Sequence, residues 1–215
     1  MLSPHVKRYF KTAISIIGGI AVALLLIQYF PLLKAELFYL VRKPTEKRAT
    51  VVIADPITID NGENVEIKAV DKEFSLIVPK IGVNVKVIPE IDPFDSKEYQ
   101  KALSQGIAHT KGTALPQERK NTVLFAHSSD NFYNANKYNA VFYLLNKLKI
   151  GDKVYVAYKS RLYKYTVTEN SVVENTAMEY MEQGYKSRLT LVTCWPPGTT
   201  LKRLVIVAVE STESF

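Results

Sequence analysis

Near the C-terminal end of the chain, two β-rich runs flank a loop that no regular strand can cross. The first run, Leu189–Cys194, alternates apolar and polar residues, and the second, Arg203–Val209, is largely apolar. Between them, Pro196, Pro197 and Gly198 prevent the first strand from continuing. Because the connection is short, the two runs are expected to form an antiparallel hairpin that ends at Cys194.

The register of this hairpin decides whether a thiol and a guanidinium become neighbours. If Cys194 and Arg203 face each other across the loop, Val192 lies opposite Val205. Cross-strand partners project from the same face with Cβ atoms about 5 Å apart, so this register places the two functional groups together. A slip of one residue would turn one of them to the other face.

A histidine supplies a second reason to examine this cysteine. The chain contains one cysteine and three histidines. A thiol needs a nearby imidazole or cation to become a useful nucleophile near neutral pH. His127 ends the apolar run 121–126, His109 lies further upstream, and His5 precedes a long charge-free segment, which leaves His109 and His127 as candidates. The alternative is that Cys194 is a small buried apolar residue and Arg203 an exposed strand end.

Four stretches together resemble the sortases, membrane-anchored cysteine transpeptidases of bacterial cell surfaces. The run 190–194 with Arg203 downstream resembles their nucleophile segment, and 124–128 resembles the segment that holds their histidine. Residues 106–116 and 142–156 resemble the family stretches before and after that histidine. The resemblance covers roughly residues 74–210 and implies a mainly β fold, the eight-stranded sortase-type barrel with short helices, preceded by one N-terminal transmembrane helix.

The resemblance also implies a role for each candidate site residue. Cys194 would attack a peptide carbonyl in a sorting signal to form a thioacyl-enzyme, and His127 would exchange protons with the leaving and incoming amines. Arg203 would donate hydrogen bonds to the substrate carbonyls and the oxyanion. His109, Thr193 and Trp195 are candidate substrate-binding residues. For His109 a packed loop histidine remains an alternative, and for Trp195 a cover over the barrel edge.

No cofactor is expected. Asp92, Asp95 and Glu98 resemble the acidic loops with which some sortases bind calcium, but three carboxylates before a helix also suit the helix dipole without a metal. A zinc site on Cys194 and His127 would need at least one more ligand, and no residue has suitable motif spacing.

The charge distribution argues against nucleic acid as a partner. The formal net charge is +7, but through residue 48 the chain carries eight Lys or Arg residues against two glutamates. The remainder holds 20 of the 28 basic and 19 of the 21 acidic residues and is nearly neutral. The basic excess therefore flanks a hydrophobic segment and does not form a groove-binding surface.

The hydrophobic segment Thr12–Leu33 contains no charged residue, and its 22 positions would rise about 33 Å as a helix, enough to cross a bilayer core. A signal peptide cleaved after Ala23 is the alternative, but the apolar run continues beyond that point, which favours an uncleaved anchor. Basic residues lie on both sides of the segment and do not set its orientation. The resemblance instead places the following domain outside the cytoplasm, on a single-pass protein of the cell membrane.

These observations predict four regions: a cytoplasmic N-terminus at 1–11, a transmembrane anchor at 12–33, a stalk or linker at 34–72, and a catalytic domain at 73–215. Within the domain, periodicity and turn residues predict the following elements. They are strands at 74–79, 83–88, near Ile107, near Val123, at 154–156 and at 162–167, helices at 97–104 and 138–148, and a capping box at 176–179.

Three functions remain open at this point. A transpeptidase would act on sorting-signal-bearing surface proteins, with an amine acceptor such as a cell-wall precursor or a pilin lysine. A cysteine hydrolase would share every motif and release the acyl group to water. A non-catalytic surface β-domain would use none of this chemistry.

Overall fold

The computed structural model describes residues 14–24, 30, 36–37, 40, 69–128, 141–184 and 186–211. The chain divides into two compact units, residues 1–43 and 44–215. In the first unit, residues 14–24 form a helix with exposed side chains. Part of the predicted membrane segment Thr12–Leu33 lies outside the described residues. Among those described, no helix is both long enough and apolar enough to span a bilayer.

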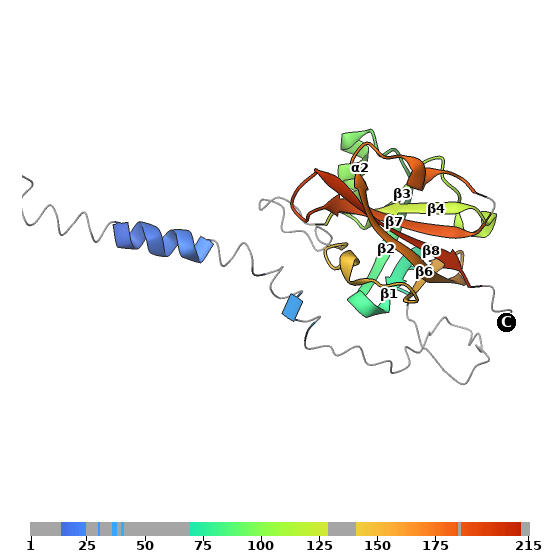
Figure 1. Cartoon of the computed structure of the whole chain (residues 1–215), viewed down its shortest axis with the longest axis horizontal. Coiled ribbons are helices and arrows are strands. Elements are labelled where there is room, and N and C mark those ends of the chain that lie inside the picture. Colours follow the sequence, from blue (N-terminus) through green and yellow to red (C-terminus); the bar gives the residue numbers. More distant parts are fainter. Residues whose placement is uncertain are drawn as a thin grey trace, which may run out of the picture. The chain divides into compact units, whose positions relative to one another are not determined.

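Within the described part of the second unit, eight strands close into a barrel (Figure 1). The strands are β1 (Phe74–Val78), β2 (Val83–Ile91), β3 (Ile107–Thr110), β4 (Asn121–Phe125), β5 (Lys153–Tyr158), β6 (Arg161–Glu174), β7 (Arg188–Trp195) and β8 (Lys202–Glu210). The helices of this unit are short: η1 (Pro79–Ile81), α2 (Ser96–Leu103), η2 (Pro116–Glu118), η3 (Leu145–Lys147) and η4 (Glu179–Met181). This architecture confirms the predicted mainly β, eight-stranded fold.

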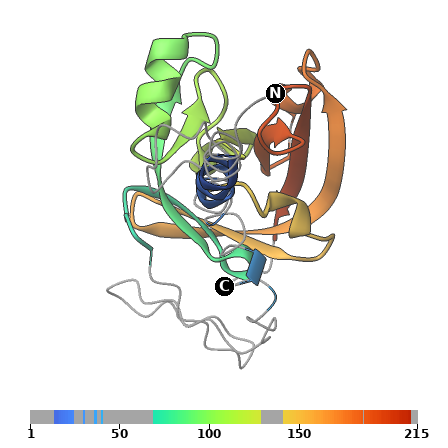
Figure 2. The ribbon, with the colours of Figure 1, turned by 90° about the vertical axis from the view of Figure 1, so that its left-hand side faces the viewer.

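The order of the strands around the barrel is β1-β2-β3-β4-β7-β8-β6-β5. Most neighbours are antiparallel, but β2 with β3 and β4 with β7 run parallel. Figure 2 shows the strands curving around the domain, with α2 at one edge. The parallel β4–β7 pair matters for the site, because parallel strands bring their C-terminal ends to the same edge of a sheet.

The barrel interior is filled by alternate residues of each strand, as strand geometry requires. On β4, β7 and β8 these inward positions include Leu124, Leu191 and Ile206, each fully buried. Leu76 of β1 and the ring of Tyr165 of β6 are equally inaccessible. The positions between them, including Cys194 and Arg203, face the outer side of the sheet.

The predicted strands are confirmed, including the hairpin of β5 and β6. Its two-residue turn, Lys159–Ser160, has positive φ at both positions, 48° and 61°. A type I′ turn needs this geometry, and its twist matches that of the flanking strands. The predicted helix at 97–104 is also confirmed as α2, whose N-cap Asp95 accepts hydrogen bonds from the backbone of Lys97 and Glu98.

The predicted helix at 138–148 is wrong over its described part, residues 141–148. These residues form turns and η3, with hydrogen bonds from Leu145 N–H to the Phe142 carbonyl and from Leu148 N–H to the Leu145 carbonyl. The apolar side chains are buried, as the spacing suggests, but against the barrel in a tighter i→i+3 turn. Tertiary packing therefore overrides the helical periodicity.

The capping box predicted at 176–179 is also wrong. The 3₁₀ helix η4 begins only at Glu179, and its N-cap, Met178, makes no side-chain cap. Ala177 N–H instead donates to the Glu174 carbonyl, so Thr176 lies in a turn that closes β6. The N-cap is therefore Met178 and not Thr176, so the helix begins two residues later than predicted.

We expect Gly106→Ala to destabilise the domain. A Cβ at this position would fall on the Lys86 carbonyl oxygen, which is backbone and cannot rotate away. Overpacking of this kind costs about 1–3 kcal/mol, and chemical unfolding of the full chain measures it. Gly184→Ala is the matched control, since nothing lies within 4 Å of its added Cβ. Equal stability of the two variants would contradict the close approach of β3 to β2.

Candidate active site

The ends of β4, β7 and β8 place the three candidate catalytic residues at one edge of the sheet. Cys194 on β7 is the cross-strand partner of Arg203 on β8, and Val192 pairs with Val205. This is the register expected from the sequence, and it turns both functional groups to the outer face. β7 continues for one residue beyond Cys194, to Trp195.

The parallel register of β4 and β7 places His127 level with Cys194. Phe125 pairs with Val192, and Ala126 N–H continues the ladder with a 3.2 Å bond to the Val192 carbonyl. Cys194 lies two residues beyond Val192 on β7, and His127 lies two residues beyond Phe125, the last residue of β4. His127 is half-buried. The register therefore pairs Cys194 with Arg203, and the backbone bond at Ala126 brings the chain that carries His127 beside this end of β7.

The backbone around His127 is held from both sides. Thr193, on the inner face of β7, donates a 2.8 Å hydrogen bond from its hydroxyl to the Ala126 carbonyl. Phe142 N–H donates to the His127 carbonyl at 3.2 Å. These hydrogen bonds hold the backbone from which the imidazole of His127 projects. A side chain that acts as a general acid must be held in place in this way.

The guanidinium of Arg203 is partly engaged by the loop between β7 and β8. Its Nη1 donates to the carbonyls of Thr200 and Lys202, at 3.3 and 3.2 Å. Its Nε and Nη2 donors make no hydrogen bond to the part of the chain that the structure describes. The loop thus orients the fork and leaves donors for an oxyanion.

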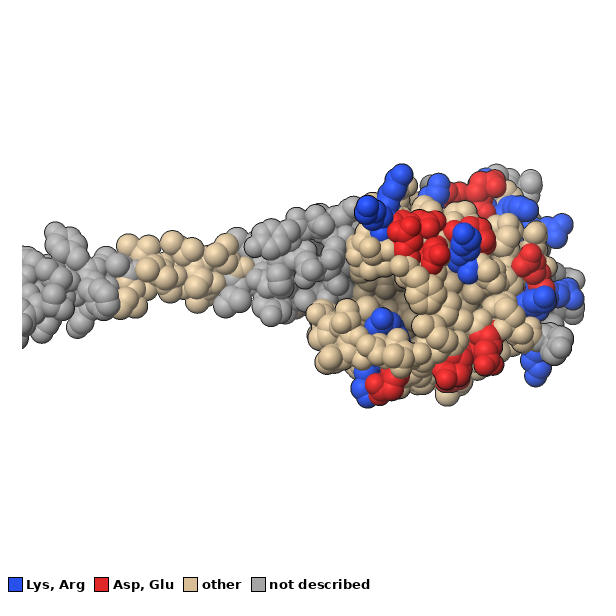
Figure 3. Space-filling view, turned by 90° about the horizontal axis from the view of Figure 1, so that it is seen from above, with Lys and Arg blue, Asp and Glu red and all other residues tan. Residues whose placement is uncertain are grey.

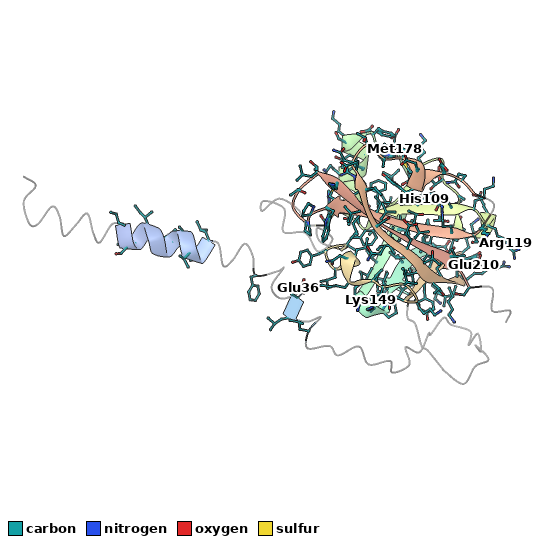
Figure 4. The ribbon with its side chains drawn as sticks, viewed as in Figure 1. Glu36, His109, Arg119, Lys149, Met178 and Glu210 are labelled. Atoms are coloured by element: carbon teal, nitrogen blue, oxygen red, sulfur yellow. The ribbon has the colours of Figure 1, made fainter. Side chains whose placement is uncertain are left out.

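His109 is packed and hydrogen-bonded within the protein interior. The side chain of His109, labelled in Figure 4, is fully buried, with 0% exposed. Its ring centroid lies 5.9 Å from that of Phe74. Nδ1 accepts from Glu90 N–H at 3.3 Å, and Nε2 lies 3.2 Å from the Ala114 carbonyl, which assigns the proton to Nε2. Burial holds the pKa of His109 below its usual value. This burial favours the alternative of a packed histidine for His109.

The two residues that flank Cys194, Thr193 and Trp195, lie on the other side of β7. Thr193 is buried, at 3% exposed, and its hydroxyl is used by Ala126. Trp195 pairs with Lys202 at the end of the hairpin, and alternation gives it the same side as Thr193. The Thr193 hydroxyl is buried and bonds to the chain next to His127. For Trp195 the geometry favours the barrel-edge alternative.

The carboxylates considered for calcium make local backbone hydrogen bonds. Asp92 accepts from Phe94 N–H at 2.8 Å, and Asp95 caps α2. Among the described residues, no group of three or more His, Cys, Asp or Glu side chains is placed to hold a metal ion. On the face seen in Figure 3, acidic and basic side chains are interspersed, as the near-neutral composition of the domain suggests.

Sequence reasoning missed two residues on the outer face of this sheet, Tyr180 and, at the start of β4, Asn121. Tyr180, between β6 and β7, packs against a cluster of Val123, Val192 and Val205 on the outer face. Asn121 holds that segment, because its Nδ2 donates to the carbonyl of Tyr180 at 2.8 Å. The only sequence feature that could have indicated these contacts was an amide side chain, Asn121, at the start of the apolar run 121–126.

We expect Thr193→Val to lower both stability and turnover. The substitution keeps the volume of the side chain but leaves the buried Ala126 carbonyl without its hydroxyl donor. An unsatisfied buried acceptor costs about 1–3 kcal/mol. Thr193→Ser keeps the donor and should stay close to wild type in both unfolding and activity. Wild-type stability in the valine variant would show that the bond does not support the site.

Comparison with known proteins identifies the family. A sequence model described as "Sortase domain" matches residues 76–211, from β1 to the end of β8. This chain belongs to the sortase family. The finding confirms the resemblance drawn from the four sequence stretches, and it covers Cys194, His127 and Arg203.

Individual sortases agree with this assignment. The chain is similar to sortase A of Listeria monocytogenes, 41% identical over 68 residues, which cover 31% of each protein. The solved structure of L. monocytogenes sortase A is 27% identical with a TM-score of 0.53, covering 64% of this chain and 86% of that one. Sortase A of Streptococcus agalactiae is 29% identical over 65% of this chain. The matches span 31% and 53% of the curated relatives' lengths.

One further solved sortase is similar to this chain in fold, at lower sequence identity. Clostridium perfringens sortase C, whose structure is described as containing the C-terminal cell wall sorting motif, is 22% identical with a TM-score of 0.52. The match covers 64% of this chain and 69% of that one. The sortase barrel is therefore shared well beyond close sequence similarity.

Proposed function

We propose that this protein is a cysteine transpeptidase that cleaves a peptide bond in a sorting signal and transfers the acyl group to an amine. One observation carries the proposal: Cys194 and Arg203 are direct cross-strand partners on the outer face, and His127 follows the end of the neighbouring strand β4 by two residues. The chain belongs to the sortase family, and a cysteine, a histidine and an arginine in this arrangement are suited to the transpeptidation that sortases catalyse.

The first half of the reaction forms a thioacyl-enzyme. The Cys194 thiolate attacks the scissile carbonyl carbon, and Arg203 donates hydrogen bonds to the oxyanion that develops. The C–N bond then breaks as His127, in its protonated form, gives a proton to the leaving amine. A thioester to Cys194 remains, and His127 is left neutral.

The second half consumes the thioester. An acceptor amine attacks the thioester carbonyl, neutral His127 takes the proton that the amine loses, and the thiolate leaves. An amide bond replaces the one that was broken, so the cycle needs no external energy source. Water in place of the amine would give hydrolysis through the same residues.

The substrates and partners are part of the proposal. The substrate would be the sorting signal of a surface protein, the class of motif named in the structure of C. perfringens sortase C. The acceptor would be an amine of a cell-wall precursor or of a pilin lysine. We propose no metal or organic cofactor, because a thiolate, an imidazolium and a guanidinium supply every proton and hydrogen bond that the reaction needs.

Product analysis tests this function and separates it from hydrolysis. The full chain in detergent is incubated with peptides bearing sorting signals, with and without an added amine, and the products are resolved by mass. The expected result is an amine-joined product in preference to the free acid, severely reduced in His127→Ala. Free acid alone across several amines would favour the hydrolase, and peptide left intact by the wild type would favour the non-catalytic domain.

We also propose that Thr12–Leu33 anchors the protein in the cell membrane with the catalytic domain outside the cytoplasm. The support is the charge-free length of the segment. The protein should fractionate with membranes and resist carbonate extraction, whereas a truncation that starts at Arg48 should be soluble and folded. A full-length protein found free in solution, or shortened after Ala23, would contradict the anchor.

A further inference from the structure

The outer face of the sheet carries a patch of valines that is covered by the chain between β6 and β7. Val123, Val192 and Val205 are 1%, 5% and 2% exposed. Strand alternation puts them on the side opposite the inward leucines, so a covering group excludes water from them. Tyr180 packs against the three valines and is part of that cover.

A buried amide holds this cover on the sheet. Asn121 begins β4, and its side chain is 0% exposed. Its Nδ2 donates to the carbonyls of Tyr180 and Glu182, at 2.8 and 3.1 Å. Its Oδ1 accepts from the Thr190 hydroxyl at 2.8 Å, which determines the orientation of the amide. Both amide donors therefore bind backbone carbonyls of the same covering segment.

The covering segment, residues 179–184, is attached to the barrel at two points. Arg188 Nη2 donates to the Glu182 carbonyl at 2.8 Å, close to the place where the chain enters β7. Asn121 supplies the contact at Tyr180, where the segment meets the valines. The amide thus determines how the covering segment lies over the outer face.

The valine patch continues directly into the catalytic pair. Cys194 and Arg203 each lie two residues along a strand from one of these valines, so they share the outer face with the patch. Val173 of β6 packs against the same valines and is the cross-strand partner of Arg203. The covering segment and the nucleophile therefore lie over one continuous face of the sheet.

We propose that Asn121 is a positioning residue of the active site, which holds residues 179–184 as a fixed wall for the bound peptide. The proposal rests on the proposed function, because it takes Cys194 as the nucleophile and a peptide as its substrate. A wall that is already ordered binds the peptide with a smaller loss of conformational entropy. Because the wall touches parts of the peptide that do not react, its loss weakens binding and leaves the chemical step unchanged.

Proteolysis of the full chain in detergent tests whether Asn121 holds the covering segment. Glu179 and Glu182 have exposed side chains, and a glutamate-specific protease cuts after them only when the backbone opens locally. In Asn121→Ala, cleavage there should be about fivefold faster than in the wild type, because two hydrogen bonds that oppose opening are lost. Asn170→Ala is the matched control, since its Nδ2 donates a 2.8 Å bond to the Leu148 carbonyl and not to this segment. It should be cut at the wild-type rate.

Peptide binding and thiol chemistry separate positioning from general damage to the fold. In a Cys194→Ala background, Asn121→Ala should raise the Kd of a fluorescent sorting peptide about tenfold. With Cys194 present, KM should rise by a similar factor while kcat is unchanged. Cys194 is the only cysteine, and its alkylation by iodoacetamide should keep the wild-type rate, because this small reagent does not need the wall. Asn170→Ala should match the wild type in all three measurements.

Thr190→Val is a second variant, which decides the question if Asn121→Ala does not fold. It keeps the amide but removes the hydroxyl that orients it, so Kd should rise about threefold. Wild-type cleavage or wild-type affinity in the folded variants would overturn the proposal, as would an alkylation rate that falls together with affinity. Peptide that binds Asn121→Ala more weakly than the wild type, but is never joined to an amine, would refute the proposed function and leave the role of Asn121 intact.

Discussion

Replacing Cys194 by alanine is expected to abolish every covalent step while the domain remains folded. The chain has no other thiol, so no thioacyl-enzyme can form on the variant. The side chain is only half-buried at the end of β7, and its loss should change the free energy of unfolding by less than about 1 kcal/mol. Mass analysis of peptide products and thermal unfolding measure the two effects.

Cys194→Ser is the stricter comparison for this prediction. The hydroxyl has nearly the size of the thiol but is a far weaker nucleophile without a strong base. The serine variant should also be inactive with an unchanged melting temperature. Peptide cleavage by either variant would mean that another residue carries the reaction, and the assignment of Cys194 would then be wrong.

Replacing Arg203 by lysine is expected to lower turnover by about a hundredfold or more, the loss seen when one oxyanion donor is removed. Lysine keeps the positive charge but cannot bind the loop carbonyls of Thr200 and Lys202 and an oxyanion with one planar fork. The thermal stability should scarcely change, because this end of β8 contributes little packing. The rate of the single-turnover acylation is the most direct measurement.

Arg161→Lys is the matched control, since Arg161 is exposed and lies at the turn between β5 and β6. It should retain wild-type acylation. If Arg203→Lys also acylated at the wild-type rate, charge alone would suffice at this position, and the bidentate role given to the guanidinium would be contradicted.

The sequence predicted the parts of the site that depend on local pattern. Alternation along β7 and β8, with Pro196 and Gly198 between them, predicted the hairpin; it left a one-residue slip open, and the observed register is the one that pairs Cys194 with Arg203. The sequence also predicted that His127 follows directly after a β-strand. These features arise within a few residues of each other or from strand geometry, which is why a single sequence reveals them.

The remaining parts depend on contacts between distant segments. Tyr180 reaches the site only because the chain between β6 and β7 folds back over the outer face, where Asn121 holds it. No local sequence pattern predicts that the segment between β6 and β7 folds back over the sheet. The same reason explains the wrong helix at 138–148: spacing alone does not show that Phe142 is tied to the His127 carbonyl and that the turns which follow pack on the barrel. His109 was a candidate by residue type, and only the fold shows that it is interior.

The intact mass of the full chain after incubation with a sorting peptide, with no acceptor amine present, tests the central claim most directly. The account predicts a mass increase equal to the acyl half of the peptide, located at Cys194 by digestion, and lost when an amine is added as the joined product appears. An adduct on another residue, or bound peptide that never becomes covalent under conditions in which Cys194 reacts with iodoacetamide, would contradict it.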